Sequence, residues 1–372
     1  MFKQVIGLGR RAGTSHAQPN RIRRYSRLKI CAQPNFLFEP LADPRQTPIL
    51  NSRTMPAPSR WTLSRRQFLA ASGALLLAPR VDAAGPDAAA AEPIIDIHQH
   101  THYHGRSDED LVKHQNAMGV TLTVLLPAGS SVVQPSTLNG KANGLQAQCH
   151  GNDSVVNLAK AHPKEFLFFA NEVPDLPEAR VELEKYLKLG ACGIGEQKFG
   201  VECDSAHIER IAEVAQEHGV PVLLHFWEGD YNRGFARFHK ILEKFPEVRF
   251  VGHAQSWWGN IDKNHDQKVA YPKGKVTPGG ITDRLLGDYP NMFGDCSAGS
   301  GLNALTRDGE FTPGFLDRHQ NKLVFGSDCE DAVGSGPKCQ GAQILAAIRR
   351  FAPNKGIERK ILYENAKNLL RL

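Results

Sequence analysis

The chain has 372 residues, a formal net charge of +6 and seven cysteines. The positive charge lies at the beginning: residues 1–54 hold ten Lys and Arg against two acidic residues, and residues 55–91 add a net +2. Residues 92–372 therefore carry a net charge of −4, which argues against a nucleic-acid partner and favours a small-molecule substrate.

The first 91 residues are predicted to be a leader. The run Ser64-Arg65-Arg66-Gln67-Phe68-Leu69 is typical of a twin-arginine export signal. The apolar stretch at 68–78 is roughly a dozen residues long, too short to span a bilayer, and Val81-Asp82-Ala83 offers small residues to signal peptidase. The sequence therefore predicts a signal peptide at about 55–83 and a linker to residue 91, with no stable membrane insertion after cleavage.

Met55 lies about ten residues before the twin-arginine pair, and we expect translation to begin there. Residues 1–54 would then be a mis-annotated extension or a disordered tail. The twin-arginine translocase carries folded proteins, so a metal site would be filled before export to the bacterial periplasm or beyond. Six cysteines remain after cleavage, and their spacing fixes neither a disulfide pairing nor a zinc ribbon.

Residues 92–372 are predicted to form one domain of TIM-barrel size. Short apolar runs alternate with helical stretches along this part of the chain. Runs such as Leu122–Leu126 are almost continuously apolar, which is typical of parallel strands covered on both faces. The predicted strands are 94–99, 120–126, 166–171, 191–197, 221–225, 248–253, 291–295 and 323–327.

Helical stretches between the strands end at Gly or Pro, which stop helices. The alternation predicts the α/β class and a (β/α)8 TIM barrel with an extra C-terminal helix. Two long loops, 127–151 and 254–282, are rich in Gly, Ser, Asn and Pro and are predicted to shape the substrate entrance. The predicted helices are 108–118, 152–161, 178–189, 205–218, 235–245, 281–288, 312–320, 340–351 and 357–370.

Groups that can bind a metal lie where the predicted strands end. His98 and His100 end the first strand and point the same way, about 7 Å apart along it. Because barrel strands end at one rim, we expect the groups to form one site. Imidazole and carboxylate ligands suit a catalytic divalent metal, with zinc as the first choice and one or two ions. The candidate ligands are His98, His100, Glu196, His225, His253 and Asp328.

This arrangement resembles the amidohydrolase superfamily, in particular the amidohydrolase-related branch that includes aminocarboxymuconate-semialdehyde decarboxylase. The resemblance covers essentially all of 92–372, and Ile361–Ala366 is similar to the closing helix of that branch. It implies the same TIM-barrel fold. The residues that carry it are Asp96, His98, His100, His225, His253, and Asp328 in Gly326-Ser327-Asp328.

The resemblance implies a role for each ligand. His98 and His100 bind the metal from the first strand, and His225 binds it from the fifth. Asp328 binds the metal and takes a proton from the attacking water, while His253 either binds a second ion or hydrogen-bonds the water. Asp328 and His253 are therefore the predicted catalytic residues.

Glu196 leaves two interpretations open. Glu196 and Lys198 lie on one face of their strand. In TatD-like members of the superfamily a Gly-Glu at this strand supplies a carboxylate that bridges two metals, whereas single-zinc decarboxylase-like members use no bridge. Glu196 is therefore either a bridging ligand or the partner of Lys198 in an ion pair at the barrel mouth.

Three further residues are candidates for binding the substrate. His102 and Arg106 follow the first strand and could line the pocket or bind an anionic group of the substrate. Lys198 could contact the substrate from the fourth strand. Asp96 is expected to face inward below His98 and to support it.

The sequence thus predicts an enzyme, an exported metal-dependent hydrolase that acts on an amide, ester or lactone bond through a metal-activated water. The alternative is a single-zinc decarboxylase of a small unsaturated or aromatic carboxylic acid, because it would use the same ligands. Phosphodiester hydrolysis ranks third, and a catalytically idle binding protein is the interpretation from a different class. The sequence names neither the substrate nor the oligomeric state, and a homo-oligomer stays open.

Overall fold

A computed structural model of the chain describes residues 92–129, 144–145 and 148–372. The chain divides into two units, 1–83 and 84–372. The predicted twin-arginine signal, its cleavage site and the start at Met55 lie outside the described residues. Within the described residues, no helix combines the length and the apolar character needed to cross a bilayer.

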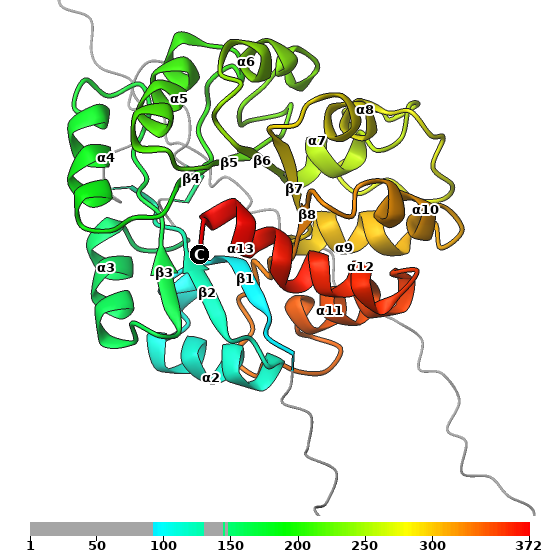
Figure 1. Cartoon of the computed structure of the whole chain (residues 1–372), viewed down its shortest axis with the longest axis horizontal. Coiled ribbons are helices and arrows are strands. Elements are labelled where there is room, and N and C mark those ends of the chain that lie inside the picture. Colours follow the sequence, from blue (N-terminus) through cyan, green and yellow to red (C-terminus); the bar gives the residue numbers. More distant parts are fainter. Residues whose placement is uncertain (1–91, 130–143, 146–147) are drawn as a thin grey trace, which may run out of the picture. The chain divides into compact units, whose positions relative to one another are not determined.

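Parallel strands and helices alternate along the described chain, and the strands surround a common centre (Figure 1). Each strand falls inside the range predicted for it, so the α/β class and the eight-stranded topology are confirmed. The strands are β1 Ile95–Gln99, β2 Leu122–Leu125, β3 Phe166–Phe168, β4 Ile194–Gln197, β5 Val222–His225, β6 Phe250–His253, β7 Met292–Asp295 and β8 Leu323–Val324.

The strands form two hydrogen-bonded sheets, β1-β2-β3 and β4-β5-β6-β7-β8. Backbone hydrogen bonds also cross both seams between the sheets. The Gly195 amide donates to the Ala170 carbonyl at 2.9 Å, between the β3 and β4 sides. The Ile97 amide donates to the Phe325 carbonyl at 3.1 Å, between β1 and the segment after β8. The strands therefore follow a ring in which backbone hydrogen bonds join the two sheets at both seams.

Helices pack outside this ring, and local sequence fixes their ends. Ser107 caps the first of them, with its side chain accepting a hydrogen bond from the Asp110 amide, and Gly119 ends it at φ 76°, a conformation that glycine adopts freely. The outer helices are α2 Asp108–Met118, α3 Asn152–Ala161, α4 Ala179–Lys188, α5 Ala206–His218, α6 His239–Lys244, α7 Ala254–Gly259, α8 Ile281–Asp288, α9 Ala298–Thr306, α10 Phe311–Arg318 and α11 Gln340–Phe351.

Two of these helices were not predicted. The expected loop at 254–282 begins with α7, and α9 lies in the segment 298–306, where no helix was expected. Tertiary packing decides their structure. Trp257 of α7 is fully buried against Gly252, where an added Cβ would lie 2.3 Å from the indole ring.

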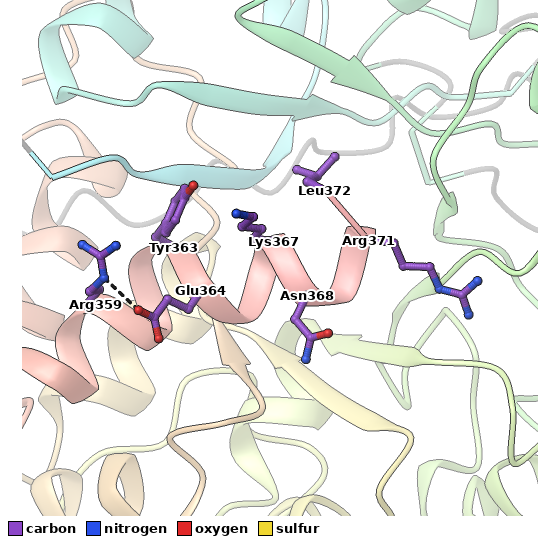
Figure 2. Close-up of a pocket in the computed structure, with 7 residues that line it drawn as sticks. All are labelled: Arg359, Tyr363, Glu364, Lys367, Asn368, Arg371 and Leu372. Carbon is purple, nitrogen blue, oxygen red and sulfur yellow. Dashed lines mark hydrogen bonds and ion pairs between the residues drawn. The ribbon is translucent and has the colours of Figure 1, made fainter.

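The C-terminal segment closes one end of the ring. It runs through α12 Lys355–Arg359, a π-helical turn Lys360–Glu364 and α13 Asn365–Leu370, so the predicted final helix is correct but interrupted. Figure 1 shows this segment in red across the centre of the strands. Leu369 and Leu370 join the apolar cluster that fills the interior. Figure 2 shows a hollow along this segment, lined by residues such as Tyr363 and Lys367.

Candidate metal centre

The candidate ligands meet at the C-terminal ends of the strands. On β5 and β6 the reason is the alternation of side chains along a strand. Leu223 and Val251 belong to the apolar interior. His225 and His253 therefore lie on the same inward face, one step nearer the rim. They are neighbours in the sheet, with ring centroids 5.2 Å apart.

On β1, an irregularity in strand pairing brings the histidine side chains to the inward face. Ile95 and Ile97 face the interior, so strict alternation would turn His98 outward. The pairing of β1 with β2 shifts register between Asp96 and Gln99, and beyond the shift His98 lies inward. The expectation that Asp96 faces inward is wrong.

Asp96 lies instead between β1 and α2. Its carboxylate accepts hydrogen bonds from Gln115 of α2 at 2.9 Å and from the amide of Ser327 at 2.9 Å. It also accepts from the His98 amide at 3.0 Å. Asp96 therefore supports the backbone that carries His98 and the segment that carries Asp328, from behind the site.

His98 and His100 offer two lone pairs to the same point. The His98 Nδ1–H donates to Asp295 Oδ2 at 2.7 Å, and the His100 Nδ1–H donates to the Leu126 carbonyl at 2.7 Å. Each ring therefore leaves its Nε2 unprotonated when neutral, and the two Nε2 atoms are 3.3 Å apart. A cation between them would satisfy both.

Carboxylate oxygens surround the same point. Asp328 Oδ1 lies 3.8 Å from His98 Nε2 and 3.5 Å from His100 Nε2, and it is buried without a hydrogen-bond partner. Glu196 Oε2 lies 3.4 Å and 3.5 Å from the same two nitrogens. A buried cluster made of acceptors alone fits a bound metal ion, because only a cation can satisfy every member.

The two carboxylate oxygens of Glu196 face different histidine ligands. While its Oε2 faces His98 and His100, its Oε1 lies 2.5 Å from His225 Nδ1 and 3.7 Å from His253 Nε2. Two groups of three ligands result, each with its donor atoms within 4.8 Å of one another: His98, His100 and Asp328, and Glu196, His225 and His253. The carboxylate of Glu196 is therefore placed between two candidate ion positions.

The electrostatics favour positive charge at this place. Burial by itself would lower the pKa of His98, but Asp328 and Asp295 raise it well above the usual value. Burial would raise the pKa of Asp328, yet the neighbouring His98 and His100 hold it far below the usual range. In the protein without metal, a proton on His98 takes the place that an ion would occupy.

The pKa values of His225 and Glu196 are both lowered, unlike that of His98. Burial and the charge of Lys198 lower the pKa of His225 to about 3. Burial would raise the pKa of Glu196, but Lys198 and His225 hold it well below the usual value. At neutral pH a neutral imidazole thus faces an ionised carboxylate, and His225 Nε2 is buried without a hydrogen-bond partner. Both groups are in the state that binds a metal.

Asp295 and Ser297 were missed by the sequence interpretation. Asp295 Oδ2 accepts from His98 Nδ1 at 2.7 Å and lies 3.3 Å from His253 Nδ1. Ser297 Oγ donates to Asp295 at 2.7 Å and lies 2.9 Å from His253 Nδ1. Together they orient two ligand rings. Asp295 could have been found from its position in the sequence, because it ends the predicted strand 291–295 as the ligands end theirs.

The three predicted substrate-binding residues do not converge. Lys198 lies at the mouth beside Tyr231, with its Nζ 5.8 Å from the ring centre, and contributes charge to Glu196. His102 is partly exposed and stacks on His150, with ring centroids 3.9 Å apart.

Arg106 is buried and holds backbone. Its guanidinium donates to the carbonyls of Cys329 at 2.7 Å and Asp331 at 3.0 Å, and to Gln99 Oε1 at 2.5 Å. These bonds favour a structural role for Arg106 in fixing the segment after Asp328, and they leave its predicted contact with substrate without geometric support.

Comparisons with known proteins agree with this architecture. Residues 95–273 match the model of the amidohydrolase family. An uncharacterized TIM-barrel protein from Bordetella bronchiseptica has a TM-score of 0.51 and 16% identity, over 75% of this chain and 98% of the other. A probable 2-pyrone-4,6-dicarboxylic acid hydrolase from Acinetobacter baumannii has a TM-score of 0.50 and 15% identity, over 75% and 99%.

A 2,6-dihydroxybenzoate decarboxylase from Rhizobium gives a TM-score of 0.49 and 14% identity, over 75% of this chain and 99% of the other. No curated protein matches the chain. At these identities the two structures with TM-scores of 0.50 and 0.51 speak for the fold alone, and the match to the family covers residues 95–273. The resemblance inferred from the sequence is thereby confirmed over residues 95–273, the part of the chain that matches the amidohydrolase family.

Proposed function

We propose that this protein is a metal-dependent hydrolase that adds water to an amide, ester or lactone carbon. The observation that carries the proposal is the position of Glu196, whose two oxygens face separate groups of ligands. This placement suits a bridge between two ions, with His98, His100 and Asp328 on one side and His225 and His253 on the other. When bound, a divalent metal supplies a Lewis acid and lowers the pKa of a bound water from 15.7 to about 7.

Asp328 is proposed to move the proton. Its carboxylate is ionised, and its Oδ2 lies 3.6 Å from His253 Nε2. Because Oδ1 faces His98 and His100, Oδ2 is the oxygen that can accept a proton from the attacking water and return it to the leaving group. Its backbone adopts φ 43°, an uncommon conformation for a non-glycine residue that is typical of functional sites.

Two other residues complete the proposed site. His253 is held by Ser297 and Asp295, and its Nε2 is available to hydrogen-bond the water or to bind the second ion. Lys198 lies at the mouth and offers a positive charge to an anionic group of the substrate. The proposed substrate is therefore a small molecule with a hydrolysable carbonyl and negative charge.

A specific contact favours a second candidate, a single-metal decarboxylase of a small unsaturated or aromatic carboxylic acid. His225 Nδ1 donates to Glu196 Oε1 at 2.5 Å, which gives Glu196 an orienting role without a second ion. His98, His100 and Asp328 would then hold one metal. Lys198 would pair with the carboxylate of the substrate.

A product assay separates the two candidates. Purified protein is incubated with a panel of lactones, esters, amides and aromatic carboxylic acids, with and without added zinc or manganese. The hydrolase predicts incorporation of one oxygen from labelled water into the product. Release of carbon dioxide without that incorporation would replace it with the decarboxylase, and no turnover of any substrate class after metal loading would leave neither supported.

We further propose that the metal is loaded before export. The ligands are spread from residue 98 to residue 328, so they come together only in the folded chain. This supports export in the folded state through the twin-arginine translocase, to the periplasm or beyond. Fusing residues 55–91 to a folded reporter tests it, with Arg65→Lys and Arg66→Lys as the matched change that should abolish export.

A further inference from the structure

A second group of metal-binding side chains lies behind the rim. His114 of α2, Cys329 and Cys339 are buried, with exposed fractions of 0%, 3% and 0%. Cys339 Sγ lies 3.8 Å from Cys329 Sγ, 3.3 Å from His114 Nε2 and 3.9 Å from Met118 Sδ. This soft cluster, His114, Met118, Cys329 and Cys339, shares no residue with the ligands at the rim.

The imidazole of the soft cluster presents a lone pair to the sulfurs. Gln115 Nε2 donates to Asp96 Oδ2 at 2.9 Å and to Thr123 Oγ1 at 2.7 Å, which turns Gln115 Oε1 the other way. The Nδ1–H of His114 donates to that oxygen at 3.0 Å. His114 Nε2 is therefore unprotonated when the ring is neutral, and it faces Cys339. Histidine ligands of metals are oriented by such a bond at the other ring nitrogen.

The spacing of the sulfurs fits a tetrahedral ion. Two sulfurs that are each about 2.3 Å from a tetrahedral zinc ion lie about 3.8 Å apart, and a histidine nitrogen lies about 3.5 Å from each sulfur. The structure has 3.8 Å between Cys329 Sγ and Cys339 Sγ and 3.3 Å between Cys339 Sγ and His114 Nε2. The sulfur separation is thus the one that an ion would require.

A fourth donor is provided by Met118. Its Sδ lies beside Gly341, and the missing side chain of this glycine leaves room for it. An added Cβ at Gly341 would lie 2.6 Å from that sulfur. Cys339 is also the N-cap of α11, and its Sγ accepts a hydrogen bond from the Ala342 amide at 3.4 Å. The sulfur of Cys339 thus accepts a hydrogen bond, as a thiolate ligand does.

We propose that the soft cluster binds a thiophilic metal ion, Zn²⁺ or Cu⁺, as a structural site separate from the catalytic centre. Two thiolates, an imidazole and a thioether are the donors that such ions prefer. The ion would fasten the segment between Cys329 and Cys339 to α2. Because Asp328 precedes Cys329, this fastening holds the catalytic carboxylate at the rim. The inference does not depend on the reaction that the rim performs.

The first test uses the unaltered protein. Elemental analysis identifies the bound metal, and X-ray absorption at the edge of that metal reports its neighbours. We expect sulfur at about 2.3 Å from part of the metal, because the rim offers nitrogen and oxygen ligands. A spectrum with nitrogen and oxygen neighbours alone would overturn the proposal, as would a Cys329–Cys339 disulfide found by non-reducing mass spectrometry.

The second test places the ion. Protein stripped of metal and reloaded with Co²⁺ should show a thiolate-to-cobalt charge-transfer band in the near ultraviolet. The pair Cys329→Ser and Cys339→Ser should abolish the band and lower the metal content by about one ion per chain. Cys149→Ser is the matched control, since Cys149 is buried on the active-site side. Loss of the band in the control but not in the pair would refute the assignment.

A third variant guards against misfolding of the pair. His114→Gln keeps both sulfurs and a polar group in place of the imidazole. We expect at least a tenfold weaker affinity for Co²⁺ in this cluster, with the wild-type far-ultraviolet circular dichroism retained. An unchanged affinity would remove His114 from the site and contradict the proposal.

Discussion

The two ends of the barrel interior have opposite chemistry, although the same strands build both. Toward one end the inward side chains are apolar, and Leu369 and Leu370 of the C-terminal helix pack against them. At the other end the inward side chains are histidines and carboxylates. On β5 the change takes two residues, from Leu223 to His225. The apolar end therefore sets the frame, and the rim carries charges whose positions that frame dictates.

The contrast between the two ends shows how buried charged and polar groups at the rim are stabilised. Each rim histidine has a second partner that fixes its orientation, such as Asp295 for His98 and the Leu126 carbonyl for His100. The remaining donor atoms face one another, and a cation bound between them would satisfy them. Changes at the rim should therefore act on activity, metal content and pH dependence, and changes at the apolar end on stability alone.

The largest expected effect is on turnover at the rim. Asp328→Asn should lower the rate of the reaction about 10²- to 10⁴-fold, because the amide cannot take the proton. Metal content should stay largely unchanged, since five other ligands remain. Asp317→Asn, a change at an exposed aspartate of α10, is the matched control and should keep the wild-type rate. Wild-type turnover in Asp328→Asn would show that another group moves the proton.

At the apolar end the expected effect is on unfolding. Leu369 is 1% exposed, and Leu369→Ala should lower the free energy of unfolding by about 2–5 kcal/mol, through lost burial and the cavity that is left. Leu189→Ala is the control, because Leu189 is 50% exposed and should change stability by less than about 0.5 kcal/mol. Denaturant titration measures both. Equal effects in the two variants would mean that the C-terminal helix does not close the core.

Removal of the metal should affect the stability contributed by the rim and leave that of the apolar end unchanged. Chelation removes the cation from the rim, and zinc added back at 100 times its dissociation constant should raise the free energy of unfolding by about 2.7 kcal/mol. Leu369→Ala should show the same gain from zinc as the wild type. In protein that also carries Cys329→Ser and Cys339→Ser, so that the soft cluster does not contribute, the combined change His98→Ala and His100→Ala should lose most of the gain. A gain that survives in that variant would mean that His98 and His100 do not hold the stabilising ion.

The smallest expected effect is a pH dependence confined to the rim. Burial would raise the pKa of Asp295, but the charge of His98 and hydrogen bonds with His253 and His98 lower it from 3.8 to about 2. Because the folded pKa is below the unfolded one, ionised Asp295 stabilises the metal-free fold by about 2 kcal/mol above about pH 4. This stabilisation is lost as the pH falls through about 2.

Urea titrations of metal-free wild type and Asp295→Asn check this expectation. The difference in free energy of unfolding should shrink as the pH falls from about 4 to about 2. The difference caused by Leu369→Ala should stay constant over that interval, since no titrating group is removed. A constant difference for Asp295→Asn would mean that its hydrogen bonds, rather than its charge, stabilise the rim.

Much of the fold and the candidate ligand set could be predicted from the sequence, because strands and their ends follow from the local pattern of apolar and polar residues. Apolar runs located each strand of the described residues, and strand ends located the six candidate ligands. The helix α7 was missed because Gly252 and Trp257 fit together only in three dimensions, and α9 packs against α7. The inward turn of His98 depends on a register shift that no spacing rule announces.

Supporting residues were harder still. Asp295 is one acidic residue at the end of a strand, and its use depends on His98 and His253 coming from distant parts of the chain. The soft cluster joins His114 to Cys329 and Cys339 across more than 200 residues, without a metal-binding spacing. Arg106 had the charge expected of a substrate ligand, but backbone carbonyls use its guanidinium. Such pairings exist only after folding.

The number of ions at the rim tests the central claim most directly. The measurement is the zinc content of protein carrying Cys329→Ser and Cys339→Ser, so that the soft cluster does not contribute. Two ions per chain, falling to one or fewer with Glu196→Gln added, is the result that a bridging Glu196 predicts. One ion per chain, unchanged by Glu196→Gln, would contradict the bridge and leave a single metal to act alone.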